Sequence, residues 1–238
     1  MTSFSIRTYI LNIKRRSDRR KMMQESLPDG LISEFTSDWG VDFDWRNIDT
    51  ELLHSFGLFP WKIKSDNPWW NRSLKKGEVA CAIAHWECWH HALETTEDTF
   101  LFLEDDVSFT PGFMRNLESA LNKLVNYDSE WDLLYLGREP LDRDEEIAKG
   151  IVKPGYSYGA YAYMLTREAV DKLTNTGFKY SLIPVDEFLP AMYIDHPRLD
   201  VRQVFHKKLH AYAIESDIVR PPDQSLYGSD TENSDFVS

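Results

Sequence analysis

The stretch Thr99-Phe100-Leu101-Phe102-Leu103-Glu104-Asp105-Asp106-Val107 joins an unbroken apolar run to three consecutive carboxylates. An apolar run of this length predicts a strand that is buried on both faces, as in a parallel sheet. Pro111 and Gly112 follow closely and open a predicted helix. Because open α/β sheets bind ligands just outside the carboxyl ends of their strands, the stretch predicts both an α/β fold and the position of its site.

The three acids need a partner if they are buried. Desolvating even one ionised carboxylate costs several kcal/mol, and a divalent cation that prefers oxygen ligands can offset this cost. Glu104, Asp105 and Asp106 therefore indicate a cation site. The alternative is an ordinary solvated acidic loop after a strand.

The composition is that of a globular protein. The 238 residues suffice for one large α/β domain or two small ones, and 42% of them are hydrophobic. The balance of 27 basic and 39 acidic residues gives a net charge of -12, which argues against nucleic acid or anionic lipid as the main partner. We see no internal repeat and no linker, and therefore predict a single domain over residues 1–238.

No apolar segment is long enough to span a bilayer, and the first residues lack the apolar core of a signal peptide. The last four residues are not an ER-retention signal. We therefore expect a soluble protein in the cytoplasm of its host or producing cell. Cys81 and Cys88 fall on one predicted helix, roughly 10 Å apart along its axis, too far to bridge each other. We interpret both as small buried apolar residues.

The chain opens with a predicted strand over residues 8–13 and a predicted helix from Ser17 or Asp18 to about Leu27. A strand, a short basic turn and a helix are typical of a nucleotide-binding α/β unit. Asn12, Arg15 and Arg20 would then lie near the carboxyl end of the strand, where they could meet phosphate charge. The alternative is an amphipathic helix with a solvated basic face.

Further elements are predicted along the chain. We expect a second strand over residues 41–45, a long loop or lid over residues 57–72, a helix over residues 79–94 and a tyrosine-rich strand over residues 156–165. Late strands are expected over residues 201–205 and 209–214. The tyrosines beside Gly159, among them Tyr161, could belong to the core or stack on a sugar or base. His85, on the helix, is expected to be a polar contact or a core histidine.

Several motifs, in order along the chain, resemble glycosyltransferase family 25, which includes bacterial lipopolysaccharide galactosyltransferases and procollagen galactosyltransferases. They are Asn12 to Arg20, Gly77-Glu78 with Cys81 and His85, and Leu103-Glu104-Asp105-Asp106. Four more segments resemble the collagen branch: Trp131 to Arg138, Pro184 to Pro190, Leu209 to Tyr212, and Tyr227 to Glu232. The resemblance implies a GT-A (Rossmann-like) fold with a mostly parallel mixed sheet flanked by helices, a UDP-sugar donor and Mn²⁺.

The resemblance also implies roles for particular residues. Glu104, Asp106 and His210 are the expected metal ligands, although His210 could instead be a strand histidine that faces the core. Donor binding is expected from Asn12, Arg15, Arg20, Glu78, Asp105 and Tyr161.

Asp186 and Glu187 are the expected catalytic acids. If the transfer inverts the anomeric centre, Asp186 is the expected general base. If the transfer retains it, the same acids only hold sugar hydroxyls. A further alternative for Asp186 is a helix N-cap between two prolines.

These assignments lead to an expected activity: transfer of galactose or glucose from UDP-galactose or UDP-glucose to hydroxylysine or galactosylhydroxylysine in collagen-like chains. The alternatives are a lipopolysaccharide-type galactosyltransferase and a non-catalytic sugar- or metal-binding module. With no signal peptide, no retention tail and a single domain, a free-standing enzyme of the kind a giant virus or bacterium encodes fits best. Trp69 and Trp70 offer a surface for a homodimer.

Overall fold

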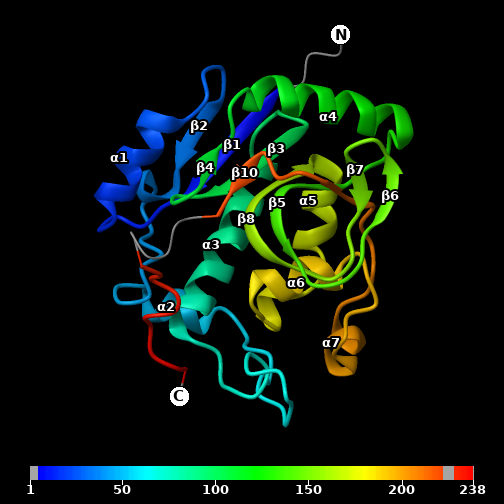
Figure 1. Ribbon diagram of the computed structural model, residues 1–238. Helices are drawn as coiled ribbons and strands as arrows, with labels where there is room; N and C mark the ends of the chain where they lie inside the picture. Colours follow the sequence, from blue (N-terminus) through cyan, green and yellow to red (C-terminus); the bar gives the residue numbers. More distant parts are fainter. Residues whose placement is uncertain (1–4, 222–227, 238) are drawn as a thin grey trace.

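The computed structural model describes residues 5–221 and 228–237, and its centre is an eight-stranded sheet (Figure 1). The sheet has the strand order β2-β1-β3-β8-β5-β9-β7-β6. In chain order its strands are β1 (Ile6–Leu11), β2 (Ile32–Phe35), β3 (Thr99–Glu104), β5 (Leu133–Pro140), β6 (Glu145–Ala148), β7 (Ile151–Lys153), β8 (Ser157–Thr166) and β9 (Ala211–Ile214). A separate two-stranded ribbon pairs β4 (Ser108–Phe109) with β10 (Val219–Arg220).

The directions of the strands determine which strand ends lie at the same edge of the sheet. β1 runs parallel to β2 and β3, and β9 runs parallel to β5. β8 lies antiparallel between β3 and β5, so that these two strands point the same way. β7 is antiparallel to β9 and to β6, so only β7 and β8 oppose the common direction. This confirms the predicted α/β class with a mixed, mostly parallel sheet, and it brings the carboxyl ends of β1, β3 and β5 to one edge with the amino end of β8.

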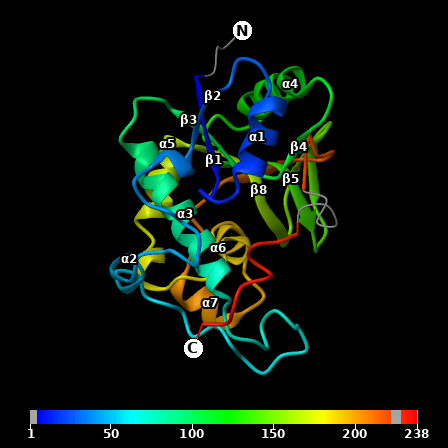
Figure 2. The ribbon, with the colours of Figure 1, turned by 90° about the vertical axis from the view of Figure 1, so that its left-hand side faces the viewer.

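The apolar run that predicted β3 is buried on both faces, as expected. Phe100, Leu101, Phe102 and Leu103 are fully buried. The two phenylalanines pack on the face covered by α3 (Lys76–Leu93), α5 (Arg167–Thr174) and α6 (Val185–Ala191). The two leucines pack on the opposite face, beneath α1 (Ser17–Ser26) and α4 (Phe113–Tyr127). Figure 2 shows the sheet between these two helical layers.

The second predicted strand, over residues 41–45, does not form. The strand beside β1 is β2, and residues 41–45 are irregular. The carboxylate of Asp42 accepts from the backbone N–H of Asp44, and that of Asp44 accepts from the N–H of Arg46. Such local side-chain bonds compete with the hydrogen bonds of a sheet. Asp42 and Asp44 therefore prevent the strand that the alternating apolar residues predict.

The strand predicted over residues 201–205 is also wrong, because α7 (Leu199–Val204) occupies this segment. Val201 and Phe205 are buried whereas Val204 is 39% exposed. Burial at positions i and i+4 follows the period of a helix rather than that of a strand. The remaining short helix, α2 (Thr50–His54), lies before the long loop.

The loop over residues 57–72 packs down through its tryptophans. Trp61 is buried, and Trp70 donates from its indole nitrogen to Glu187. Trp69 is 42% exposed and carries the guanidinium of Arg72 over its ring. Trp70 is half-buried against the core, so Trp69 is the more exposed of the two tryptophans that we predicted for a homodimer surface.

The C-terminal segment lies against the start of α3. The hydroxyl of Ser234 accepts from the backbone N–H of Gly77, and Val237 N–H donates to the carbonyl of Leu74. A side chain at Gly77 would meet the backbone of Thr231 at 2.6 Å, so this close approach requires glycine. Within the described part of the chain, no helix has the length and apolarity needed to cross a bilayer. Of the predicted motifs, only Tyr227 lies outside the described residues.

Candidate functional site

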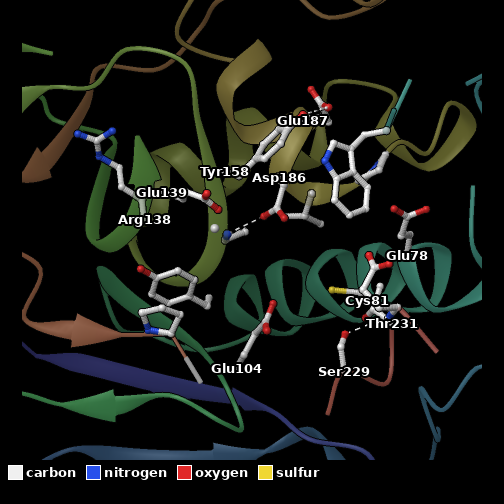
Figure 3. A pocket seen from close by; sticks show the side chains of 18 of the residues that line it. Glu78, Cys81, Glu104, Arg138, Glu139, Tyr158, Asp186, Glu187, Ser229 and Thr231 are labelled. Atoms are coloured by element: carbon white, nitrogen blue, oxygen red, sulfur yellow. Dashed lines mark hydrogen bonds between the residues drawn. The ribbon is translucent and has the colours of Figure 1, made fainter. Parts of the chain in front are cut away.

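A cavity of about 610 Å³ opens at the sheet edge where β3 and β5 end and β8 begins (Figure 3). Glu104 comes from the end of β3, Arg138 and Glu139 from the end of β5, and Asp186 from the first turn of α6. The cavity therefore lies where the acidic stretch after β3 predicts a site. Trp61, Trp69, Tyr158 and Tyr161 contribute aromatic surface to its walls.

The three acids after β3 point in different directions. Asp105 faces away from the cavity, where it accepts from Asn12 Nδ2 at 2.6 Å and from Arg19 Nη1 at 3.0 Å. Asp106 places Oδ2 at 2.7 Å from the same Arg19 nitrogen. Its Oδ1 is buried and has no hydrogen-bond partner among the described residues. Glu104 and Asp106 both line the cavity, and Asp105 does not.

Burial raises the pKa of each of these acids. The pKa of Glu104 lies well above its ordinary value, first because of desolvation and then because of the nearby charge of Asp106. Burial raises the pKa of Asp106 to about 6, although Arg19 opposes the shift. Two carboxylates that resist ionisation side by side can be stabilised by a divalent cation. The orphaned Asp106 Oδ1 and the neighbouring Glu104 fit such an ion.

Arg19 is a site residue that the sequence reasoning did not select. Its side chain is buried and bridges Asp105 and Asp106, and its Nη2 donates to the carbonyl of Gly228 at 2.7 Å. In α1 only Arg19 and Met23 are buried. Arg19 and Met23 are four residues apart and therefore share one face of the helix. The apolar Met23 indicates that this face is buried, and this was the signal in the sequence that could have selected Arg19.

Asn12, Arg15 and Arg20, which were predicted to bind the donor, divide into two groups. Asn12 lines a second, smaller cavity of about 110 Å³, and Arg15 pairs with Asp44 and Asp230, which line the same cavity. Arg20 instead bonds to Ser37 and Asp38, and its guanidinium lies 4.5 Å from the ring centre of Phe35. The structure thus brings Asn12 and Arg15 to the site and places Arg20 away from it.

Asp186 points into the larger cavity from α6 (Figure 3). Its Oδ1 accepts from the backbone N–H of Ala160 at 2.6 Å. Burial raises its pKa to about 6, against the effect of this hydrogen bond. A carboxyl group in this state can take up a proton near neutral pH.

Glu187, its neighbour, is engaged on all sides. Its carboxylate accepts from Trp70 at 2.8 Å, from Tyr156 at 2.5 Å and from Tyr158 at 3.0 Å, and it lies 2.8 Å from His196 Nε2. Burial alone would raise its pKa, but the hydrogen bonds, led by that of His196, hold the pKa below its ordinary value. This carboxylate joins α6 to the loop and to β8.

Glu78 and Tyr161, the other residues predicted to bind the donor, also line the cavity. The carboxylate of Glu78 receives two bonds from Arg72, at 2.6 and 2.9 Å, and one from the N–H of Lys75 at 2.7 Å. It thereby caps the start of α3. Tyr161 is 7% exposed, and burial raises its pKa.

His210 corrects our prediction of a third metal ligand. Its side chain is 56% exposed and places Nδ1 at 3.0 Å from Asp128 Oδ2. It directly precedes β9, which is parallel to β5 from Leu133 onward. It therefore lies at the amino end of the sheet, whereas the acids lie at the carboxyl end of β3. At about 3.3 Å per strand residue, the length of β3 separates the two ends.

The charge of the larger cavity is strongly unbalanced. One basic residue, Arg138, is found among the described residues that line it. The acids are Glu78, Glu104, Asp106, Glu139, Asp186, Glu187, Asp217 and Glu232. Glu78 is paired with Arg72, and Glu232 with Lys75. The remaining excess of acids favours the binding of a phosphorylated ligand together with a cation.

Comparison with known proteins gives a family for this chain. Residues 5–147 match the family model described as glycosyltransferase family 25 (LPS biosynthesis protein). Procollagen galactosyltransferase 1-B of Xenopus laevis is 31% identical over 95% of this chain and 38% of its own length. The probable inactive glycosyltransferase 25 family member 3 of Rattus norvegicus is 32% identical over 94% of this chain and 39% of its own.

Among solved structures, mouse xyloside xylosyltransferase 1 in its apo form covers 90% of this chain and 87% of its own, with 11% identity and a TM-score of 0.32. This likeness is too low to carry an argument. The chain spans less than two fifths of the length of the curated relatives described above. The family match itself extends over the β1–α1 unit, α3, the acidic stretch and β5. The chain therefore belongs to glycosyltransferase family 25.

Proposed function

We propose that this chain is a metal-dependent glycosyltransferase that moves galactose or glucose from a UDP-sugar to hydroxylysine or galactosylhydroxylysine of collagen-like chains. The observation that carries the proposal is that Glu104 and Asp106 line one cavity, and that Asp106 Oδ1 has no hydrogen-bond partner among the described residues. The described lining of this cavity holds eight acids and one arginine. Such an excess of acids favours the binding of a sugar diphosphate together with a cation. The collagen-like acceptor is proposed from the names of relatives such as procollagen galactosyltransferase 1-B.

On the donor side, Glu104 and Asp106 would hold a divalent ion such as Mn²⁺. When bound, that ion supplies charge neutralisation for a departing diphosphate. Arg19 holds Asp105 and Asp106 in place from the side of α1. The smaller cavity, with Asn12 in its wall and Arg15 beside it, is the place that we assign to the uridine end of the donor.

On the acceptor side, the aromatic surfaces of Trp61, Trp69 and Tyr158 suit the apolar faces of a sugar. Asp186 reaches into the cavity from the opposite wall to Glu104 (Figure 3). In an inverting transfer, Asp186 would take the proton of the acceptor hydroxyl. In a retaining transfer, it would hold a sugar hydroxyl through the same carboxylate.

The test is a transfer assay with hydroxylysine and galactosylhydroxylysine peptides, a panel of UDP-sugars, and Mn²⁺ present or chelated. We expect one hexose mass to be added, only with metal. The variant Asp106→Asn should reduce transfer by at least about 100-fold, on the scale of losing one key charge-stabilising group. Its matched control is Glu139→Gln, an exposed acid at the rim of the same cavity. Absence of transfer to every acceptor, with the protein folded, would remove the proposed activity.

A non-catalytic sugar- or metal-binding module is the second candidate, favoured by the relatives of rat and mouse that are named as inactive. Calorimetry with UDP and Mn²⁺ separates the two. A donor-using enzyme binds UDP more tightly in the presence of Mn²⁺, whereas a module that has lost the donor site does not. The family description also names lipopolysaccharide biosynthesis, and transfer to a sugar acceptor but not to a peptide would indicate that chemistry.

A further inference from the structure

Cys81 and His85 lie one turn apart on α3 and face the end of β3. The Cys81 sulfur, one ring nitrogen of His85 and one carboxylate oxygen of Glu104 all lie within 4.8 Å of one another. Cys81 and Glu104 line both the larger and the smaller cavity, so an ion can reach them from either. Figure 3 shows Cys81 on α3 beside Glu104.

The second observation is the state of His85. This side chain is fully buried, and its Nε2 has no hydrogen-bond partner among the described residues. Its other nitrogen, Nδ1, lies 2.7 Å from the hydroxyl of Tyr163, which also accepts from Trp89 Nε1 at 3.0 Å. A buried polar atom without a partner is costly. Metal-bound histidines usually donate their second ring N–H to such a fixed partner.

The chemistry of these ligands differs from that of the proposed donor-metal site. Hard ions such as Mn²⁺ prefer carboxylates and water, whereas a thiolate and an imidazole favour Zn²⁺ and its neighbours among the transition metals. With bonds of 2.0–2.3 Å, tetrahedral zinc ligands lie roughly 3.5 Å apart. A change of about one ångström in the side chains of Cys81 and Glu104 brings the group to that spacing.

We propose that Cys81, His85 and Glu104 form a second, softer metal site that takes Zn²⁺ in the wall between the two cavities. On binding, the thiol of Cys81 loses its proton to solvent and the sulfur bonds to the ion. His85 binds through Nε2 while its Nδ1–H donates to Tyr163. Because Glu104 belongs to both proposed sites, Zn²⁺ bound here competes with the donor-metal site for this carboxylate.

The experiment uses Co²⁺ and Zn²⁺ alone, without donor or acceptor, so that its result does not depend on the proposed transfer activity. We expect Co²⁺ to produce a thiolate charge-transfer band in the near ultraviolet at one equivalent, and Zn²⁺ to abolish it. The band should be lost in Cys81→Ala. It should remain in Cys88→Ala, the matched control, because Cys88 lies two turns further along the same helix in the core.

Competition with a zinc indicator should show that Cys81→Ala weakens Zn²⁺ binding by roughly 100-fold, on the scale of losing one ligand group, and Mn²⁺ binding by less than about threefold. X-ray absorption of the zinc-loaded protein, which needs no variant, should show one sulfur in the first shell at about 2.3 Å. A first shell without sulfur, or a cobalt band that survives in Cys81→Ala, would overturn the proposal. Loss of the band in a folded Cys88→Ala would do the same.

Discussion

The indole Nε1 of Trp70 donates a 2.8 Å hydrogen bond to Oε1 of Glu187, which ties the long loop to the first turn of α6. Tyr156 and His196 complete the surroundings of the same buried carboxylate. A carboxylate that is fully engaged in this way has no lone pair directed at a substrate. Glu187, which we predicted to be catalytic, is therefore better assigned as the group that positions Asp186 and the loop.

Replacing Glu187 by Gln tests this assignment. The amide must leave at least one of the donors around it unsatisfied, so we expect a loss of about 2–4 kcal/mol in the free energy of unfolding. Urea denaturation measures the loss, with the exposed Glu139→Gln as the control that should remain within about 0.5 kcal/mol of wild type. A variant as stable as wild type but more than about 100-fold slower in transfer would return Glu187 to a catalytic role.

Asp186→Asn should separate proton transfer from folding. The amide oxygen can still accept from the N–H of Ala160, so the fold should persist, while loss of a general base costs 10²–10⁴-fold in kcat. The pKa of Asp186 is raised to about 6, and only the ionised form is a base. With Mn²⁺ held at saturation at every pH, wild-type kcat/KM should therefore rise with pH up to about 6 and then level off, and the variant should lack this rise.

The anomeric configuration of the product, read by NMR, decides between the two roles of Asp186. An inverted product together with a slow Asp186→Asn identifies the carboxylate as the base. A retained product with kcat within about threefold of wild type would show that Asp186 only holds a sugar hydroxyl.

Divalent cations should bind more tightly as the pH rises. Burial raises the pKa of Asp106 to about 6 and raises the pKa of Glu104 well above its ordinary value, so at low pH the ion must displace protons. Each displaced proton weakens binding by about tenfold per pH unit below the pKa. Without metal, these raised pKa values mean that the folded state binds protons more strongly than the unfolded chain. Their contribution to stability is therefore present at low pH and is lost as the pH rises through the raised pKa values, of which that of Asp106 is about 6.

The measurement is the shift in Tm on adding Mn²⁺ at pH 5 and at pH 7, since other acids contribute equally with and without the ion. We expect the larger stabilisation at pH 7. Asp106→Asn should reduce the shift at both values. A shift that is independent of pH in wild type would exclude Glu104 and Asp106 as ligands.

The part of the fold that the sequence predicted rests on burial. β3 was predicted because four consecutive apolar residues can be buried on both faces only in the interior of a sheet, and Phe100 to Leu103 are fully buried. The acids that follow were placed at the site because strand ends and ligands coincide in such sheets. Residues 41–45 and 201–205 were mispredicted, because local aspartate bonds and a helical period decided those segments.

The site was predicted less completely, because side-chain direction depends on neighbours that are distant in sequence. Arg19 and Arg20 are adjacent, yet only Arg19 lies on the buried face of α1. In the sequence, Glu187 forms an acid pair with Asp186. Only the structure shows that Trp70, Tyr156 and His196 bind its carboxylate. For His210, strand direction was the missing information, because the same residue type at the other end of β9 would have faced the acids.

His210→Ala checks this correction directly. The imidazole is exposed and pairs with Asp128 at the surface, and exposed ion pairs contribute about 0–1 kcal/mol. We expect unfolding free energy to change by no more than this, and both transfer and Mn²⁺ affinity to remain within about twofold of wild type. Asp106→Asn, measured in parallel, should show the loss of Mn²⁺ affinity that is expected when a metal ligand is removed. A tenfold weaker response to Mn²⁺ in a folded His210→Ala would contradict this correction.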